Sequence, residues 1–302
     1  MSVPAPRVLM IRPAAFGPNP ETAASNAFQR RPPPGDLLAL ARAEFDAAVT
    51  ALRAAGVDVV VADDTPQPVK PDAVFPNNWF SSHPDGTVVL YPMEAQNRRL
   101  ERRRELLEDL ARRGQLRMQR VIDLSPLEAR GEYLEGTGSL IIDRAAGRAY
   151  AALSSRTHSA ALAEFTRATG LQVSAFRTAD DAGRSLYHTN VMLSLGDRFA
   201  VVCLDAVPDA AERSCLADDL AMGGRDVIEI SRAQMQAFCG NVLQVGRPGA
   251  RPAIALSATA HDAFSAGQRD RLATHGDLVR VTIPLIEQVG GGSIRCMLGE
   301  LY

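Results

Sequence analysis

The chain has 302 residues, 46% of them hydrophobic, and a formal net charge of −2 at pH 7. That length fits one large or two ordinary globular domains, and the near-neutral charge gives no electrostatic basis for binding nucleic acid or an anionic membrane. No apolar stretch reaches the ~18 residues that span a bilayer, and the first residues lack the basic region and apolar core of a signal peptide.

The cysteines are few and scattered. Cys203, Cys215, Cys239 and Cys296 include no C-x-x-C pair, so they form neither a disulfide framework nor a zinc motif. We therefore expect a reduced, cytoplasmic protein that binds no metal.

The N-terminal part of the chain predicts a strand at 8–11, a helix at 36–55 and a strand at 57–61. Between the first strand and the helix, residues 13–35 are rich in Pro, Asn and Gly and have no periodicity. Such a segment is compatible with a surface loop or with a lid over a site.

The rest of the chain repeats a unit of hairpin, helix and strand. The predicted helices lie at 97–113, 157–170, 209–222 and 262–274, each followed by a short strand, at 120–124, 171–173, 226–230 and 278–281. A last strand at 294–298 has no helix after it. Pairing it with the first strand would complete a fifth unit and close a ring without free sheet edges.

An open α/β sheet is the alternative to this ring. The hairpins disfavour it because they form antiparallel pairs, and no G-x-G-x-x-G follows a strand. The short Gly136-Thr137-Gly138 run does not meet that pattern.

Polar and reactive residues recur at one phase of the repeat. Asn78, Glu135, His188, Asn241 and Cys296 follow one another at intervals of roughly 50–57 residues. Residues at equivalent positions of a closed repeat point to one axis. We therefore expect a thiol, an imidazole and a carboxylate to share a site.

Six short motifs carry a family resemblance. In chain order they are Arg12-Pro13, the run from Pro71 to Trp79, Glu135-Gly136-Thr137-Gly138, Ser154-Ser155-Arg156-Thr157, His188-Thr189-Asn190 and the Gly-rich run to Cys296. With them the chain resembles the guanidino-group-modifying enzymes of the pentein fold, and most of all the amidinotransferase-like citrulline-utilisation hydrolases. The resemblance covers essentially the whole chain. It implies a single catalytic domain over residues 1–302, an α/β propeller of five ββαβ blades.

The resemblance also implies a catalytic set of Cys296 as nucleophile, His188 as general acid and base, and Glu135 as the carboxylate beside the substrate nitrogens. A thiolate can add to the planar carbon of a guanidino or ureido group, and an imidazole can move the protons. A cysteine in an apolar segment is more often an inert core residue, as we expect of Cys203 and Cys239. Cys296 differs because three glycines precede it closely.

Further residues are implied to bind the substrate. Arg156 matches an arginine that grips an α-carboxylate, a task that suits a planar guanidinium. Either Arg98 or Arg99 would supply a second contact, although a charged helix surface is an equal alternative for both. Asp72 and Phe75 resemble residues that line the substrate amine and chain.

Asn78 and Asn190 stand where arginine deiminases carry aspartates that clamp the guanidinium. An amide offers a donor and an acceptor, which match a neutral ureido group better than a cation. We therefore expect citrulline to be hydrolysed to ornithine, carbon dioxide and ammonia through a covalent thiol intermediate and without a cofactor. The alternatives are an arginine deiminase, a dimethylarginine hydrolase, an amidinotransferase or a non-catalytic pentein binding protein. The expected partner is a small amino-acid substrate, and a homodimer is left open.

Overall fold

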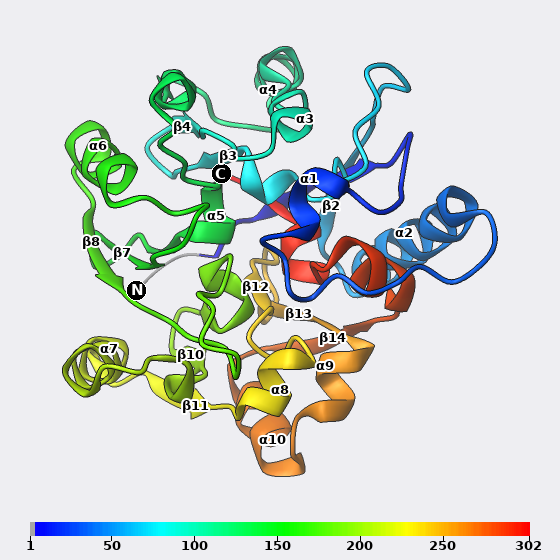
Figure 1. The fold of residues 1–302 in the computed structure, drawn as a ribbon. Coiled ribbons are helices and arrows are strands. Elements are labelled where there is room, and N and C mark those ends of the chain that lie inside the picture. Colours follow the sequence, from blue (N-terminus) through cyan, green and yellow to red (C-terminus); the bar gives the residue numbers. More distant parts are fainter. Residues whose placement is uncertain (1–3) are drawn as a thin grey trace.

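The computed structural model describes residues 4–302, whose strands form five three-stranded sheets around a common centre (Figure 1). In every sheet the middle strand pairs antiparallel with one neighbour and parallel with the other. The parallel pairs require a crossover, which helices supply on the outside of the molecule. The repeated unit expected from the sequence is therefore confirmed.

One sheet joins the two ends of the described chain. β1 (Arg7–Arg12) pairs in parallel with β2 (Asp58–Asp63), which follows helix α2 (Leu37–Ala54), and antiparallel with β15 (Gly299–Leu301). The register sets Val8 opposite Glu300 on one side and Val59 on the other. The expected pairing of first and last strands is confirmed, although the last strand lies after the predicted range 294–298.

The other four units follow in chain order, each as two strands, its helices and a third strand. The second unit consists of β3 (Phe80–Ser82), β4 (Thr87–Leu90), α3 (Gln96–Arg99), α4 (Arg104–Arg112) and β5 (Arg120–Asp123), and the third of β6 (Ile141–Asp143), β7 (Arg148–Ala152), α6 (Ser159–Thr169) and β8 (Gln172–Phe176). The fourth unit consists of β9 (Leu193–Leu195), β10 (Phe199–Val202), α7 (Ala210–Ala221) and β11 (Asp226–Glu229). The fifth consists of β12 (Leu243–Val245), β13 (Ala253–Ser257), α9 (Ala258–Ala263), α10 (Ala266–His275) and β14 (Asp277–Val281).

Two predicted helices are broken in the structure. The range 97–113 divides into α3 and α4 because Glu101 turns inward to pair with buried Arg98, and Arg103 leaves helical geometry at φ −113° and ψ 78°. The range 262–274 divides into α9 and α10, with Ser265 capping the second helix through a capping box with Gln268. The apolar periodicity continues across both breaks, which is why the sequence suggested single helices.

Helix α2 shows how an outer helix is fixed to its sheet. The Asp36 side chain caps it by accepting a hydrogen bond from the N–H of Ala39 at 3.0 Å. Its buried residues recur every three or four positions and pack on the first sheet and on β14: Ala41, Phe45, Ala48, Val49 and Leu52. Burying such a stripe gives most of the stability of a helix in a globular protein.

Short helical turns precede the inner strands of four sheets and meet at the centre. They are η1 (Pro76–Asn78), α5 (Gly136–Ser139), η3 (Thr189–Val191) and η6 (Ile294–Met297). Turn α5 contacts η1 and η3, and η1 contacts η6. Segments that recur along the sequence are thus brought to one place, as their common phase predicted.

The remaining short elements connect these units. They are α1 (Pro20–Ala23), η2 (Ser125–Arg130), η4 (Leu204–Ala206), α8 (Arg232–Gln236) and the π-helical turn η5 (Ile286–Gly290). Within residues 4–302, no helix has the length and apolarity needed to cross a membrane.

Candidate active site

The central turns and the N-terminal segment enclose a small pocket. Seven of the ten predicted site residues line it: Asp72, Phe75, Asn78, Arg98, Arg156, His188 and Cys296. Two more, Glu135 and Asn190, lie directly behind the lining and bond to His188 and Cys296, respectively. The repeat therefore gathers residues that are more than 200 positions apart in the sequence, such as Asn78 and Cys296.

Glu135 and His188 form a buried pair. His188 Nε2 lies 2.8 Å from Glu135 Oε2, and the other carboxylate oxygen accepts the N–H of Glu94 at 3.0 Å. Burial acts to raise the pKa of Glu135, but the charges of Arg156 and Arg98 and the hydrogen bond from His188 outweigh it and hold that pKa well below its usual range. The carboxyl group is therefore ionised, so His188 Nε2 carries the hydrogen and donates it.

The His188 imidazole is neutral at pH 7. Burial lowers its pKa to about 4, with help from the positive charges of Arg156 and Arg98 and against the effect of Glu135. Because Nε2 donates to Glu135, Nδ1 has a free lone pair and can accept a proton.

Gly138 explains the Gly-Thr-Gly motif beside Glu135. A Cβ at Gly138 would lie 2.3 Å from Asn78 Nδ2 and 2.8 Å from His188 Nδ1, distances that real Cβ atoms do not show. Gly136 has φ +49°, and a Cβ there would lie 2.3 Å from the carbonyl oxygen of Asn77. Both glycines therefore allow Asn78 and His188 to approach the α5 turn closely.

Cys296 is held by two amides. Its Sγ is 3.4 Å from Asn190 Nδ2 and 3.3 Å from Asn241 Nδ2, and the side chain is 3% exposed. Asn241 Oδ1 in turn accepts the N–H of Arg295 at 3.1 Å. Cys296 was expected on a strand, and it lies instead in the η6 turn, in which its N–H donates to the Ser293 carbonyl at 2.9 Å.

The other cysteines have different surroundings. Cys203 and Cys239 are fully buried, and burial raises the pKa of both thiols, that of Cys239 to about 12. Cys215 is exposed on α7. The sequence did not single out Asn241 as a site residue, although its place in the repeat gave the signal.

Arg98 fixes the orientation of Asn78. Arg98 Nη1 donates to Asn78 Oδ1 at 2.9 Å, so the Asn78 amide nitrogen points elsewhere. That nitrogen has no hydrogen-bond partner among residues 4–302, and neither has Asp72 Oδ1 nor Asn190 Oδ1. These buried atoms are available to a ligand.

The adjacent arginines have different places. Arg98 is 3% exposed and lines the pocket, where it also pairs with Glu101 at 2.9 Å. Arg99 donates to the carbonyl oxygens of Met93 and Glu94 and lies outside the pocket lining. Of Arg98 and Arg99, between which the sequence could not decide, Arg98 is therefore the residue that lines the pocket.

Arg156 joins the Glu135–His188 pair to the N-terminal segment. Its guanidinium lies 3.5 Å from Glu135 Oε2 and 5.1 Å from the centre of the Tyr187 ring. It also donates to Ser25 Oγ at 2.7 Å and to the Thr22 carbonyl at 3.2 Å. The cation is thus compensated on two sides.

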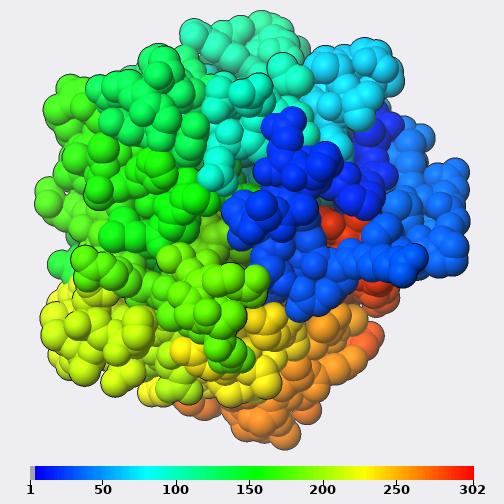
Figure 2. All heavy atoms as spheres, viewed as in Figure 1, coloured from blue at the N-terminus to red at the C-terminus, as the bar shows by residue number. Residues whose placement is uncertain are grey.

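Residues 13–35 form one wall of the pocket, through Thr22 and Asn26. Asn26 Nδ2 donates to the Gly290 and Gly291 carbonyls at 3.3 Å, and Asn19 Nδ2 donates to Asp72 Oδ2 at 2.7 Å. Figure 2 shows this N-terminal segment, in dark blue, covering the middle of one face, with part of the red C-terminal region visible beside it. Of the two interpretations from the sequence, the covering position fits a lid.

Tyr187, a pocket residue that the sequence did not single out, binds the glycine-rich turn from another side. Its O–H donates to the Gly291 carbonyl at 2.5 Å. Within the described residues, no three His, Cys, Asp or Glu side chains are grouped as ligands of a metal ion.

Comparison with known proteins assigns this chain to a class. A model of the eukaryotic N,N-dimethylarginine dimethylhydrolase family matches residues 12–302, whereas no curated protein matches the chain. The protein is a pentein-superfamily hydrolase of non-peptide carbon–nitrogen bonds. Within that class, the chain belongs to the N,N-dimethylarginine dimethylhydrolase family.

Solved structures share the fold at low sequence identity. The substrate-bound N-terminal domain of ArgZ, an arginine dihydrolase of the ornithine-ammonia cycle in cyanobacteria, has a TM-score of 0.73 and 15% identity over 97% of this chain and 96% of its own. A variant of AgrE bound to L-arginine has a TM-score of 0.74 and 16% identity, and the match covers 97% of this chain and 39% of AgrE. A dimethylarginine dimethylaminohydrolase adduct with S-methyl-L-thiocitrulline has a TM-score of 0.66 and 16% identity over 98% and 100% of the two chains.

Proposed function

We propose that this protein hydrolyses the terminal ureido or guanidino group of a free amino acid through a covalent bond to Cys296. Within that class we propose citrulline as the substrate, with ornithine, carbon dioxide and ammonia as products. We also propose that residues 1–302 are a single catalytic domain and that the five sheets form a closed five-bladed propeller. The pairing of β1 with β15 supports this closure.

The orientation of Asn78 is the observation that carries the choice of citrulline. Because Arg98 occupies Asn78 Oδ1, the amide of this pocket-lining residue keeps its N–H without a partner among residues 4–302. A ureido oxygen can accept that hydrogen, whereas a guanidinium has only donors. Asn190 Oδ1, the other unpaired amide atom at the site, can accept an N–H of the same group.

The proposed reaction begins with neutral His188. The Cys296 thiol proton moves to His188 Nδ1 while Sγ bonds to the ureido carbon. The imidazolium then protonates one ureido nitrogen, whose bond to that carbon breaks. Water, activated by the neutral imidazole, attacks the carbonyl carbon of this thioester and the C–S bond breaks, which restores the thiol and releases a carbamic acid. That acid loses carbon dioxide, which frees the second nitrogen. In sum, citrulline and one water give ornithine, carbon dioxide and ammonia.

Charged residues around the pocket suit the other end of an amino acid. Arg156 and Arg98 are the cations that we assign to the α-carboxylate, and the unpaired Asp72 Oδ1 is the acceptor that we assign to the α-ammonium. Phe75 provides an apolar surface for the methylene chain. The free space in the pocket is about 10 Å³, roughly that of one water molecule. We therefore propose that residues 13–35 move to admit the substrate.

Arginine is a second candidate substrate. The ionised Glu135 and the carboxylate Asp72 favour a cation, and the fold is that of the ArgZ domain, an arginine dihydrolase. Release of the first ammonia would convert arginine into citrulline, and the steps above would then follow in the same site. The two candidates differ in the number of ammonia molecules released for each ornithine.

Product analysis tests the proposal. The purified protein is incubated separately with citrulline, arginine, dimethylarginine and agmatine, and ornithine, citrulline and ammonia are quantified. We expect one ammonia and one ornithine from each citrulline consumed. Conversion of arginine to citrulline without ornithine would replace the proposal with a deiminase, and no turnover of any compound would support a binding protein.

Asn78→Asp tests the specificity argument. A carboxylate would pair with Arg98 and would lose the N–H donor toward the ureido oxygen, so kcat/KM for citrulline should fall at least about tenfold. The Kd for arginine should decrease because a charge-assisted contact replaces a neutral one. The double variant with Asn190→Asp should extend both changes. Unchanged citrulline turnover and arginine affinity would show that Asn78 and Asn190 do not determine the substrate.

A further inference from the structure

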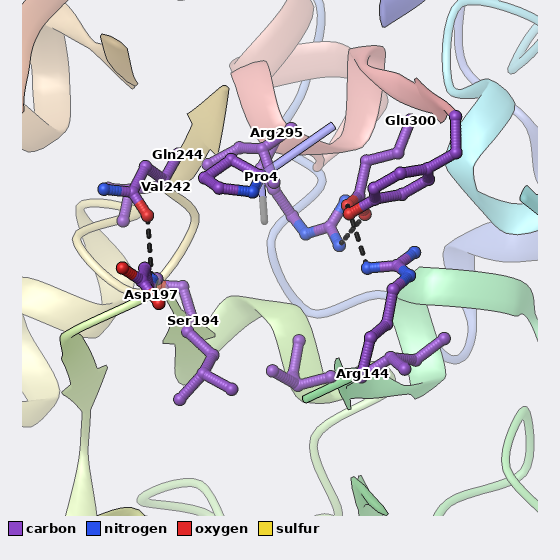
Figure 3. Close-up of a pocket in the computed structure, with 14 residues that line it drawn as sticks. Pro4, Arg144, Ser194, Asp197, Val242, Gln244, Arg295 and Glu300 are labelled. Atoms are coloured by element: carbon purple, nitrogen blue, oxygen red, sulfur yellow. Dashed lines mark hydrogen bonds and ion pairs between the residues drawn. The ribbon is translucent and has the colours of Figure 1, made fainter. Parts of the chain in front are cut away.

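A second cavity lies on the other side of the η6 turn from the candidate active site. Cys296 lines the first pocket, and its neighbour Arg295 lines the second, together with residues of β6, β9, β12 and β15 (Figure 3). The cavity has a volume of about 40 Å³. That is room for a few heavy atoms, since one water needs about 10–15 Å³ on the same measure.

Hydrogen-bond donors in this cavity lack partners. Arg295 is 5% exposed, and its Nη1 has no acceptor among residues 4–302. Ser194, 2% exposed, likewise has no partner for its Oγ, and Arg144 has none for its Nε. A buried donor without an acceptor destabilises the folded state, and more so when it is charged. The cavity therefore presents donors that a bound group could satisfy.

The two arginines share a single carboxylate. Glu300 Oε1 lies 3.1 Å from Arg144 Nη1, and Glu300 Oε2 lies 3.5 Å from Arg295 Nη2. The O–H of Tyr302 also donates to Glu300. Burial lowers the pKa of Arg295 and Arg144 lowers it further, in spite of the opposing effect of Glu300. The Glu300 side chain thus pairs with both buried cations, and Arg295 Nη1 stays without an acceptor among residues 4–302.

Asp197 also lines the cavity, with a carboxylate side chain. It lies beside Ser194 and Gln244, away from the Glu300 cluster (Figure 3), and its N–H donates to Gln244 Oε1 at 2.8 Å. Between Asp197 and either arginine, the described residues show no ion pair. His83, which faces Arg144, is neutral at pH 7 because burial and that arginine lower its pKa to about 4.

We propose that this cavity binds a small planar oxyanion, either the carboxylate of a small acid or bicarbonate. A planar guanidinium matches two oxygens of such an anion, and the Ser194 hydroxyl can donate to one of them. The cavity volume excludes a phosphorylated metabolite. The proposed ligand lies outside the Cys296 pocket and contacts no residue that we assign to the reaction.

Thermal unfolding with added anions tests this site. The whole chain is titrated with acetate, bicarbonate and, as a control, chloride at constant ionic strength. We expect a saturating rise of a few degrees in Tm with acetate, bicarbonate or both, and none with chloride. Saturation by only one of the two oxyanions identifies the source of the ligand.

Three variants locate the binding. Ser194→Ala should weaken the apparent affinity roughly five- to tenfold, and Arg295→Met should abolish the rise in Tm. Arg156→Ala should retain it, because Arg156 belongs to the other pocket. If Arg295→Met does not fold, Ser194→Ala decides. A rise in Tm that disappears in Arg156→Ala, or that is unchanged in both Ser194→Ala and Arg295→Met, would overturn the proposal.

A crystal structure in acetate or bicarbonate gives the direct test. We expect planar density within hydrogen-bond distance of Arg295 Nη1 and Ser194 Oγ. Density for ordered water alone at saturating anion would show that the cavity is a hydrated pore, and the proposal would be wrong.

Discussion

The two pockets on either side of the η6 turn leave different polar atoms unpaired. The Cys296 side has a donor, Asn78 Nδ2, together with acceptors on Asp72 and Asn190. On the Arg295 side, the unpaired atoms of the arginines are donors, and the unpaired acceptor Asp197 Oδ1 lies beside Ser194, away from the arginines. Because an unpaired buried group is unfavourable until a ligand arrives, each set indicates its ligand's chemistry. The first fits a group with both N–H and C=O, and the second fits an anion.

The largest expected effect is on kcat, because we propose that the chemical reaction takes place only in the Cys296 pocket. Cys296→Ser should reduce kcat for citrulline about 1000-fold or more, because a hydroxyl is a much weaker nucleophile than a thiolate. The stability should change little. Cys215→Ser is the matched control, since Cys215 is exposed on α7 and far from the reaction in our proposal. Steady-state kinetics and denaturant unfolding of both variants check the prediction.

Alkylation sharpens the same test. In the Cys215→Ser protein, iodoacetamide should modify Cys296 before Cys203 or Cys239, because burial raises the pKa of the latter two thiols. Mass spectrometry of the peptides identifies the labelled residue. Faster labelling of Cys203 or Cys239, or full activity of Cys296→Ser, would contradict the assignment of Cys296 as the nucleophile.

Acid should lower the free energy of unfolding through two buried histidines, His188 at the Cys296 pocket and His83 near Arg144. His188 and His83 each have a folded-state pKa of about 4 and an unfolded value of 6.5, so their contribution is present above pH 6.5 and is lost as pH falls toward 4. The difference amounts to about 3 kcal/mol of unfolding free energy for each group. Glu135 adds to the loss only below its unfolded value of 4.5, because its folded-state pKa is lowered.

Chemical denaturation between pH 7 and pH 4 measures this effect. His188→Gln and His83→Gln should each make the free energy of unfolding depend less on pH, because each variant removes one of the two buried imidazoles. A dependence that is unchanged in both variants would show that neither imidazole is kept neutral by burial.

Carboxylate recognition should have an intermediate effect. Arg156→Ala and Arg98→Ala should each raise KM for citrulline roughly tenfold or more, the value of one charge-assisted contact. Arg156→Lys should recover part of the loss. Arg99→Ala is the control, because Arg99 lies outside the pocket. KM values close to that of the wild type in both alanine variants, measured with folded protein, would refute the assignment.

The smallest expected effect concerns the glycine-rich turn. Tyr187→Phe removes the O–H that donates to Gly291 at 2.5 Å and should lower the unfolding free energy by about 1 kcal/mol. Tyr150→Phe is its control, because the Tyr150 hydroxyl makes a longer bond, 3.4 Å, to the Asp219 carbonyl. Only the first variant should also change kcat/KM. Equal kinetics in the two variants would show that the turn does not depend on Tyr187.

Much of the fold could be predicted because each unit carries its own signals. Hairpins, amphipathic helices and the phase of Asn78, Glu135, His188 and Cys296 are all local patterns. The η6 turn could not be distinguished from a strand, since its residues are all buried and no periodicity remains. The path of residues 13–35 was also undetermined, because side-chain contacts such as those of Asn26 fix it, rather than a repeat.

The choice between Arg98 and Arg99 shows where sequence reasoning ends. Adjacent helix residues point about 100° apart, so Arg98 and Arg99 could not both face the pocket. Which one depends on where the helix breaks, and the break depends on the pairing of Arg98 with Glu101. Asn241 was overlooked for another reason, since an uncharged amide has no signal except its position in the repeat.

The pairing of β15 with β1 has a consequence for biosynthesis. A ribosome makes Arg7–Arg12 early, but its antiparallel neighbour, Gly299–Leu301, is made nearly 300 residues later. At about 5–20 residues per second, the first strand waits on the order of 15–60 seconds for this partner. Cys296 lies just before the late strand, so the thiol that we propose as the nucleophile takes its place only when the last sheet closes.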